Sequence, residues 1–476
     1  MAKLKNYNGR YCESEYESAF IAFLQSVGWT YLPGNKIKRC YRDVLIADDF
    51  RAFITKANTD LLEEEIEQIY DTVRLVGAES DFATLHKVYK WMVDGIQFTP
   101  QSGLPIQVTL IDFETPENNI FHVVNQLTVD YINNGQRENR RPDVLLYVNG
   151  MPLCIIELKN PADSHSTIYD AWEQITIRYW RDIPHLLHYC PLACISDGVK
   201  TRLGTVRTPY EHFYAWRRVN DADKISTMPF AETETMIKGV YAPERFLEIF
   251  RDYIYFQDEI FDCDEREIVC RYPQFFAVRL LKQSIIKSVM EQTGKGGTYF
   301  GATGCGKTYT MAFLARQLAL RCSDIPEIGS PTIVMIVDRD ELQEQGIKLF
   351  AKSKEFLNLG EVSIVKSRNN LRQELGSRES GGFYICTIQK FCDRKEDKIG
   401  LINDRHNIIC FSDEAHRTQL EHSRKIQFSK DADENMKAMV SKPYAKVLKE
   451  AFPHATFVGF TGTPIAETYQ TFGDEI

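Results

Sequence analysis

The stretch RRPDVLLYVNGMPLCIIELKN, residues 140–160, reads as two apolar strands joined by an Asn-Gly turn. Three charged residues interrupt this pattern: Asp143 precedes the first strand, and Glu157 and Lys159 lie near the end of the second. Charged side chains are rarely buried unless they are paired. Their position beside two apolar strands therefore indicates either a chemical site or an ion pair.

The connection between the two strands decides whether these charges meet. Glu157 and Lys159 share one face of their strand, because successive side chains alternate. A two-residue turn would place Asp143 on the opposite face from Glu157, whereas an odd number of connecting residues brings them together. We therefore predict a three-residue loop at residues 148–150 with a left-handed glycine, or a bulge with the same effect.

A cluster of this kind suits a divalent cation. Asp143 and Glu157, with the carbonyl oxygen of Leu158, offer the hard oxygen ligands that Mg²⁺ prefers. Mg²⁺ can stabilise charge on a phosphate and activate an attacking water, which Lys159 can orient. The alternative is an ion pair between Glu157 and Lys159 on an edge strand.

A second motif, GATGCGKT at residues 301–308, matches G-x-x-x-x-G-K-[ST] between an expected strand and an expected helix. In that position the loop N–H groups and the helix N-terminus can cradle the phosphates of ATP. Lys307 would contact the β- and γ-phosphates, and Thr308 would hold Mg²⁺. The residues expected to bind nucleotide in this loop are Gly301, Thr303, Gly304, Cys305, Gly306, Lys307 and Thr308.

Two further segments extend the nucleotide site. IICFSDEAH, residues 408–416, ends an apolar strand with Asp413, placed to hold the Mg²⁺ shell, and Glu414, placed to activate water. RYPQFFAV, residues 271–278, offers Gln274 as a reader of adenine. The alternative for Gln274 is a surface position between aromatic core residues.

Length and composition describe an ordinary globular chain of two or three domains: 476 residues, 43% hydrophobic and 26% charged. No apolar run approaches the roughly 18 residues of a membrane span, and no signal peptide is evident. The net charge of −9 leaves a nucleic-acid enzyme open, because DNA binding needs only a local basic groove. None of the twelve cysteines forms C-x-x-C, so we expect reduced, buried thiols in a cytoplasmic protein, with a metal cluster as the alternative.

The pattern along the chain predicts an α/β fold in two parts. Mixed strands and helices in residues 1–255 indicate a mixed sheet with flanking helices, ending in a polar connecting segment. Apolar strands alternate with helices in residues 256–466, which is typical of a parallel sheet covered on both faces. We expect residues 467–476 to begin a link to a further domain.

The first cluster resembles the core of the PD-(D/E)xK nucleases, with PD at 142–143 and ELK at 157–159. That resemblance implies catalytic roles for Asp143, Glu157 and Lys159. It also implies that Glu17, on an expected helix, reaches the metal site, and that Gln174 and Tyr179 form a Gln/Tyr motif. Tyr179 lies one residue beyond the usual Q-x-x-x-Y spacing. The alternatives are a surface Glu17 in a first helical turn and a Tyr179 that only fills the core.

The second set resembles the first half of a superfamily 2 helicase-like motor, a RecA-like domain. GFTGTP, residues 459–464, resembles motif III of such motors. VDRDELQEQ (337–345) and TIQKF (387–391) lie where these motors contact a nucleic-acid strand, or are plain loops. A second lobe with its arginine finger does not occur by residue 476, so we expect slow ATP hydrolysis by a fragment or a shortened relative.

In this order on one chain, the two sets resemble the motor and endonuclease (R) subunit of Type I restriction-modification enzymes. The resemblance implies ATP-driven translocation on double-stranded DNA and Mg²⁺-dependent cutting of unmethylated DNA away from the recognition site. The implied partners are methyltransferase and specificity subunits, with no membrane. Two alternatives stay open: a repair or recombination helicase–nuclease acting on DNA ends, and a non-catalytic, ATP-gated docking module.

Overall fold

The computed structural model describes the chain in the ranges 13–77, 79–160, 167–226, 228, 231–257, 265–302, 304–337, 349–350, 354–360, 362–391, 400–413, 415, 426–430, 436–440, 444–464 and 466–476. The chain divides into two compact units, residues 1–272 and 273–476. The division lies beyond the boundary near 255 expected from the sequence. The reason is that β11 (Ile254–Gln257) pairs with β12 (Arg266–Val269), and β12 contacts β10 of the first unit.

The first unit is built on a six-stranded mixed sheet in the order β1-β4-β7-β8-β9-β10. β1 pairs parallel with β4 and β8 pairs parallel with β9, whereas the other three pairings are antiparallel. β7 and β8 are buried along their whole length, as their continuous apolar sequence predicts for central strands. The strands are β1 (Thr30–Pro33), β4 (Phe121–Asn125), β7 (Val144–Val148), β8 (Met151–Leu158), β9 (Leu192–Ser196) and β10 (Thr201–Thr205).

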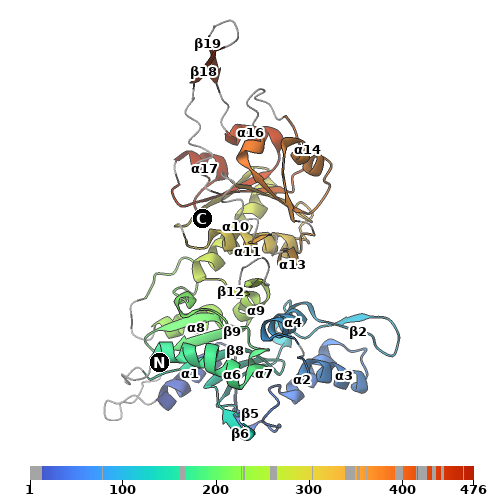
Figure 1. The fold of residues 1–476 in the computed structure, drawn as a ribbon, viewed down its shortest axis with the longest axis vertical. Coiled ribbons are helices and arrows are strands. Elements are labelled where there is room, and N and C mark those ends of the chain that lie inside the picture. The colour runs from blue at the N-terminus through green and yellow to red at the C-terminus, as the bar shows by residue number, and fades with distance from the viewer. Residues whose placement is uncertain are drawn as a thin grey trace. The chain divides into compact units, whose positions relative to one another are not determined.

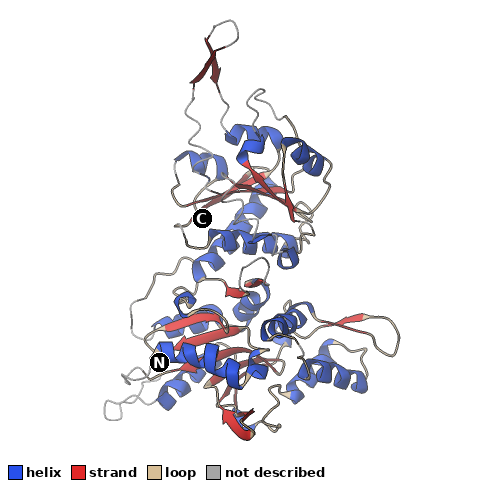
Figure 2. Cartoon of the chain, viewed as in Figure 1, coloured by secondary structure: helices blue, strands red, loops and turns tan. Residues whose placement is uncertain are grey.

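Helices flank this sheet, as Figure 2 shows. α1 (Glu13–Ser26) contacts β1, β4 and β8 and buries Phe20, Ile21 and Leu24, the apolar face expected from its sequence. The other helices are α2 (Ala47–Ala57), α3 (Glu63–Arg74), α4 (Asp81–Asp94), α5 (Ile168–Glu173), a π-helix (Gln174–Tyr179), α6 (Trp180–Asp182), α7 (Pro184–Leu187), α8 (Ala231–Val240) and α9 (Pro243–Asp252).

Two small hairpins complete the first unit, formed by β2 (Ile96–Phe98) with β3 (Ile106–Val108) and by β5 (Val129–Asn133) with β6 (Gln136–Arg140). The β5–β6 hairpin runs directly into the segment that carries Asp143. Short 3₁₀ helices occur at Gly34–Lys36, Pro116–Asn118 and Tyr210–His212 in this unit and at Ile388–Phe391 in the second.

The second unit is built on a parallel six-stranded sheet in the order β13-β20-β17-β14-β16-β15. Its central strands are buried along almost their whole length, as expected for a sheet covered on both faces. The strands are β13 (Lys295–Phe300), β14 (Thr332–Val337), β15 (Val362–Ile364), β16 (Phe383–Thr387), β17 (Ile408–Asp413) and β20 (Thr456–Thr461). A separate hairpin joins β18 (Ile426–Lys430) and β19 (Met436–Val440).

Figure 1 shows α10, α11 and α13 on one face of this sheet and α14, α16 and α17 on the other. The second face encloses a hydrophobic cluster in which Leu371 of α14, Leu448 of α16 and Phe472 of α17 meet side chains from the strands. The helices are α10 (Tyr272–Glu291), α11 (Lys307–Arg321), α13 (Lys354–Leu357), α14 (Arg368–Gly376), α16 (Tyr444–Ala451) and α17 (Ala466–Phe472).

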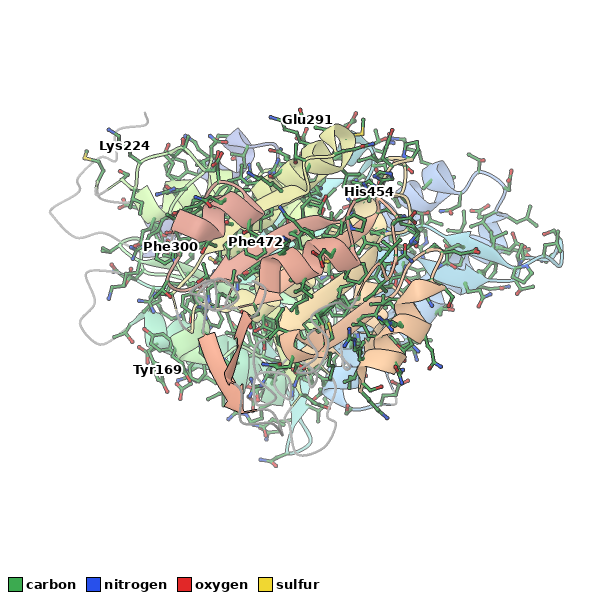
Figure 3. All side chains as sticks on the ribbon, turned by 90° about the horizontal axis from the view of Figure 1, so that it is seen from above. Tyr169, Lys224, Glu291, Phe300, His454 and Phe472 are labelled. Atoms are coloured by element: carbon green, nitrogen blue, oxygen red, sulfur yellow. The ribbon has the colours of Figure 1, made fainter. Side chains whose placement is uncertain are left out.

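Residues 467–476 are integrated into the second unit, which differs from the expected start of a link. Phe472, labelled in Figure 3, packs over β20, so that a Cβ added at Gly459 would lie 2.9 Å from Phe472 Cγ. Beyond α17 the chain returns along β13: Thr298 N donates to Asp474 O at 2.8 Å, and Ile476 N donates to Thr298 O at 2.9 Å. The segment therefore adds to the β13 edge of the sheet.

The α/β fold predicted from the sequence is confirmed in both units. Cys154, Cys386 and Cys410 are buried, and the cysteines within the described ranges are free thiols. Among the helices the structure describes, none combines the length and apolar character that crossing a membrane requires.

Candidate functional site

The β7–β8 hairpin contains a bulge that sets the register of its charged residues. Asn149 and Gly150 form a two-residue turn with positive φ angles of 50° and 77°, so the predicted three-residue loop is wrong. The predicted alternative, a bulge, is confirmed: Tyr147 pairs with Pro152 and Leu146 with Cys154, which leaves Leu153 as the extra residue.

This bulge brings Asp143 and Glu157 together. Val144 pairs with Ile156, so Asp143 and Glu157 are the next opposed positions of the ladder. Asp143 Oδ2 accepts a hydrogen bond from Leu158 N at 2.9 Å, and Asp143 N donates to Glu157 Oε1 at 3.4 Å. Both side chains are buried, with Glu157 fully inaccessible. Two carboxyl groups thus meet inside the first unit.

Lys159 completes the cluster at the end of β8. Its Nζ lies 3.8 Å from Glu157 Oε2 and donates to Gln174 Oε1 at 3.0 Å. The alternative of an ion pair on an edge strand is wrong, since β8 lies between β7 and β9 inside the sheet. Lys159 is therefore held beside both a carboxylate and an amide.

Gln174 and Tyr179 both reach Glu157 from the π-helix. Gln174 Nε2 donates to Glu157 Oε2 at 2.8 Å and to the Tyr179 hydroxyl at 2.7 Å, and that hydroxyl donates to Glu157 Oε1 at 2.7 Å. A π-helix stacks residues five apart, so it absorbs the extra residue in the Gln/Tyr spacing. Tyr179 is buried, which agrees with the alternative that it fills the core, but its hydroxyl also contacts Glu157.

Glu17 is joined to this cluster through two residues that the sequence reasoning missed. Asn125 Nδ2 donates to Glu17 Oε1 at 2.6 Å, and Gln126 Nε2 donates to Glu17 Oε2 at 2.8 Å. Gln126 Nε2 also lies 3.2 Å from Asp143 Oδ1. A sequence signal existed: a polar Asn-Gln pair directly follows the apolar strand FHVV. Glu17 is thus half-buried beside the site rather than a free surface residue.

The electrostatics of the cluster fit a divalent cation. Burial, together with the neighbouring Asp143, raises the pKa of Glu157 well above its ordinary value. Burial also raises the pKa of Tyr179, which keeps its hydroxyl protonated as a donor. The cluster presents two carboxylates, and Mg²⁺ is commonly held by one or two carboxylates, with water and phosphate oxygens completing its shell. The donor set of Asp143 and Glu157 therefore suits Mg²⁺.

The expected phosphate-binding loop connects β13 to α11 in the second unit. Gly306 precedes α11 with a φ of 87°, a left-handed conformation that glycine adopts without strain. Lys307 begins the helix, and its Nζ donates to the Gly301 carbonyl at 3.4 Å, inside the loop where phosphates are expected. Thr308 follows in the first helical turn, and Thr303 lies outside the described residues.

Gln274 contacts this loop from α10. Its side chain is only 4% exposed, so the surface alternative is wrong. Gln274 Nε2 donates to the Gly306 carbonyl at 3.1 Å, next to the lysine of the motif. Gln274 therefore supports the backbone of the GATGCGKT loop.

Three parallel strands bring the remaining motifs to the same edge of the sheet. Asp413 ends β17 and pairs with Phe460 of β20, and the Thr461 carbonyl accepts a hydrogen bond from Gly301 N at 3.0 Å. The carboxyl ends of β13, β20 and β17 therefore meet, as in sheets that bind nucleotides. Glu414 and residues 338–345 lie outside the described residues, whereas 387–391 form the end of β16 and a 3₁₀ turn.

Comparison with known families assigns both units. Residues 10–212 match the family described as the Type I restriction enzyme R protein N terminus. Residues 273–476 match the SWI2/SNF2 ATPase family.

Similar proteins extend over almost the whole chain. The Type I restriction enzyme HindI endonuclease subunit of Haemophilus influenzae is 32% identical over 483 residues, covering 97% of this chain and 44% of that protein. A chain of Methanocaldococcus jannaschii, provisionally described as the type I restriction enzyme MjaIXP endonuclease subunit, is 29% identical over 97% of this chain and 43% of its own length. A solved fragment provisionally described as a Vibrio vulnificus HsdR subunit of a type I restriction enzyme is 15% identical, with a TM-score of 0.25, over 75% of this chain and 54% of that one.

The chain joins a first unit, in which the carboxyl groups of Asp143 and Glu157 meet, to a second unit that matches an ATPase family. Taken with the two family matches, this chain belongs to the endonuclease (R) subunit family of type I restriction enzymes. It spans less than half the length of the curated relatives it matches.

Proposed function

We propose that this chain supplies the DNA-cutting site and part of the ATP-driven motor of a Type I restriction enzyme. In this proposal the nuclease lies in the first unit, residues 1–272, which extends beyond the 1–255 expected from the sequence, and the motor begins at about 273. The protein acts in the cytoplasm on unmethylated double-stranded DNA, away from the recognition site. Methyltransferase and specificity subunits provide recognition, which agrees with a chain that carries no base-reading motif of its own.

One observation carries the nuclease part of the proposal: side chains from separate segments converge on Glu157. Asp143 comes from the start of β7, Lys159 from the end of β8, and Gln174 and Tyr179 from the π-helix. A salt bridge alone would not require this. Four polar residues assembled around a fully buried carboxyl group are typical of a functional site, where perturbed ionisation is common.

The side chains have separable roles in this proposal. Asp143 and Glu157 would hold Mg²⁺, which when bound neutralises negative charge around the scissile phosphate. Lys159 orients the attacking water or stabilises charge on the phosphate, and Gln174 holds Lys159 Nζ in place at 3.0 Å. Tyr179 fixes the orientation of Glu157 by donating its hydroxyl proton.

The motor part rests on the meeting of the P-loop with β17 and β20. Lys307 would exchange the Gly301 carbonyl for ATP phosphates, Thr308 and Asp413 would hold the Mg²⁺ of ATP, and Glu414 would activate water. ATP hydrolysis would then drive movement along DNA. The 459–464 segment, which includes the end of β20 and the turn after it, would link the ATP site to the bound DNA.

A plasmid assay tests the proposal against its alternatives. The full-length protein, with and without methyltransferase and specificity subunits, is given unmethylated closed-circular DNA or linear DNA, with Mg²⁺ and with or without ATP. We expect cutting of the circle that needs the partners, ATP and Glu157, as judged with Glu157→Ala. Cutting from linear ends without the partners would instead support a repair helicase–nuclease. ATP binding without cutting in any condition would support a docking module.

A further inference from the structure

Gln126 occupies an unusual backbone position directly after β4. Its φ of 50° lies in the left-handed region, which residues other than glycine adopt rarely and at a cost in energy. Its backbone N donates to the Asp143 carbonyl at 3.1 Å, which ties this turn to the start of β7. Such a conformation persists only where the surroundings hold it, and it clusters at functional sites.

The side chain of Gln126 connects two carboxylates. Its Nε2 lies 2.8 Å from Glu17 Oε2 and 3.2 Å from Asp143 Oδ1, so one amide donates to both. The other oxygen of Asp143 accepts from Leu158 N at 2.9 Å. Both oxygens of Asp143 are therefore held, one by β8 and one by Gln126, and the rotation of this carboxylate is fixed.

Asn125 supports the same arrangement from the end of β4. Its Nδ2 donates to Glu17 Oε1 at 2.6 Å, and its Oδ1 accepts from the Tyr31 hydroxyl at 3.0 Å, which orients the amide. Both oxygens of Glu17 thus accept hydrogen bonds from two consecutive amides. Without these donors, Glu17 and Asp143 would face each other as like charges.

We propose that Gln126 is a positioning residue that sets Asp143 and Glu17 in the geometry required to bind a divalent cation. The inference rests on the proposed nuclease function. Gln126 acts through the two carboxylates: its amide offsets their repulsion and fixes the direction of the Asp143 oxygens. Partners of this kind, which orient metal ligands, change metal affinity or activity by about 10- to 100-fold when they are replaced.

Three substitutions distinguish the role of the Gln126 side-chain amide from that of its backbone conformation. Gln126→Ala removes the whole amide. Gln126→Glu keeps the size but replaces the N–H donors by oxygen. Gln126→Asn keeps an amide and a residue type that tolerates the left-handed region, but it is too short to reach both carboxylates. Gln136 on β6 is exposed, so Gln136→Ala serves as the matched control.

Two measurements are made on the full-length protein, with melting temperature as the check on folding. The first is the Mg²⁺ concentration that gives half-maximal plasmid cutting by the assembled enzyme. The second is Mn²⁺ binding without nucleotide, followed by electron paramagnetic resonance, with Glu157→Ala giving the background. We expect all three variants to weaken Mn²⁺ binding and to raise the Mg²⁺ requirement by about 10- to 100-fold, and Gln136→Ala to match the wild type.

The outcomes distinguish this inference from the function on which it rests. If Glu157→Ala changes neither cutting nor Mn²⁺ binding, the proposed nuclease function fails. If Glu157→Ala is inactive while folded Gln126 variants bind Mn²⁺ and cut like the wild type, only the positioning role is overturned. Wild-type Mn²⁺ binding and cutting by Gln126→Asn would also overturn the positioning role, because the backbone conformation alone would then suffice. Should Gln126→Ala not fold, the Glu and Asn variants decide.

Discussion

Gln174 and Tyr179 lie five residues apart and still contact each other, with Gln174 Nε2 donating to the Tyr179 hydroxyl at 2.7 Å. In an α-helix, residues five apart point in different directions, whereas residues three or four apart share a face. The π-helix at Gln174–Tyr179 restores the shared face with one additional residue. The local helix type therefore decides whether both side chains reach Glu157.

Removing the additional residue should be tolerated. Deleting the half-exposed Ile177 would let the segment close as an α-helix, with Gln174 and the tyrosine then four residues apart and on one face. We expect plasmid cutting within about tenfold of the wild type. Inserting an alanine after Ile177 would instead turn the tyrosine away from Glu157 and abolish cutting. Equal loss of cutting in both variants would contradict the role given to the π-helix.

Replacing Tyr179 by phenylalanine tests the hydroxyl alone. The ring would still fill its buried position, but Glu157 would lose the hydrogen bond that it accepts at 2.7 Å. Leaving a buried polar group with one partner fewer costs about 1–3 kcal/mol, so we expect a 10- to 100-fold slower cutting rate. The rate of ATP hydrolysis by the same variant is measured for comparison with its cutting rate. An unchanged cutting rate would show that Tyr179 only fills the core.

Gly306→Ala should weaken nucleotide binding. The φ of 87° is strained for alanine by about 1–2 kcal/mol, and the new Cβ would lie 2.7 Å from Gln274 Nε2. We expect ATP affinity to fall about tenfold or more, measured by titration calorimetry. Gly304→Ala is the matched comparison, because its φ of 81° is similar but a Cβ there meets nothing within 4 Å. Equal effects of the two changes would show that the contact with Gln274 is unimportant.

Gln274→Ala tests whether this residue reads adenine or only supports the loop. If Gln274 reads adenine, the preference for ATP over GTP should fall by about tenfold, the value of one hydrogen bond of roughly 1.4 kcal/mol. If it only supports the Gly306 carbonyl, both nucleotides should weaken equally. Steady-state hydrolysis of ATP and GTP measures the ratio. A preserved preference would reject the adenine role.

We expect Glu267 to make the stability of the first unit depend on pH. Its carboxyl oxygens are buried, and this burial raises its pKa well above the ordinary value, although Thr205 and Arg207 act in the opposite direction. In the unfolded chain this group loses its proton at lower pH than in the folded chain. The free energy of unfolding should therefore fall as the pH rises from the unfolded pKa, near 4.5, towards the folded one.

Glu267→Gln should remove this dependence. We expect the variant to melt at a higher temperature than the wild type at pH 8, with a smaller difference at pH 5, measured by thermal unfolding at both values. Glu265→Gln is the control, because Glu265 is partly exposed and pairs with Arg207 at 3.2 Å. If the difference in melting temperature between Glu267→Gln and the wild type is the same at both pH values, the prediction is wrong.

The sequence was sufficient for the fold of the second unit because its strands are buried on both faces and its P-loop has a fixed context. β14 and β17 read as apolar runs, and the GKT motif marks the start of α11. The end of the chain was harder to predict. The polar stretch after Ala466 gives no sign that Phe472 packs over Gly459.

In the first unit the charged residues of the hairpin and the need for a loop or bulge between them were predictable. Alternation along β8 places Glu157 and Lys159 on one face, but the position of the bulge, at Leu153, leaves no mark in the sequence. The same holds for the π-helix, since Gln174–Tyr179 has no composition that distinguishes it from an α-helix. Gln126 was missed because its role depends on a left-handed backbone and on contacts with distant residues.

The most direct test of the two-site account uses Glu157→Ala and Lys307→Ala in the assembled full-length enzyme on unmethylated circular DNA. Translocation is followed by displacement of a third DNA strand, and cutting by loss of the closed circle. We predict that Glu157→Ala hydrolyses ATP and displaces the third strand at the wild-type rate but does not cut. Lys307→Ala should neither hydrolyse ATP nor displace the third strand. Normal cutting by Glu157→Ala would contradict the account, because the hairpin carboxylates would then not form the nuclease site.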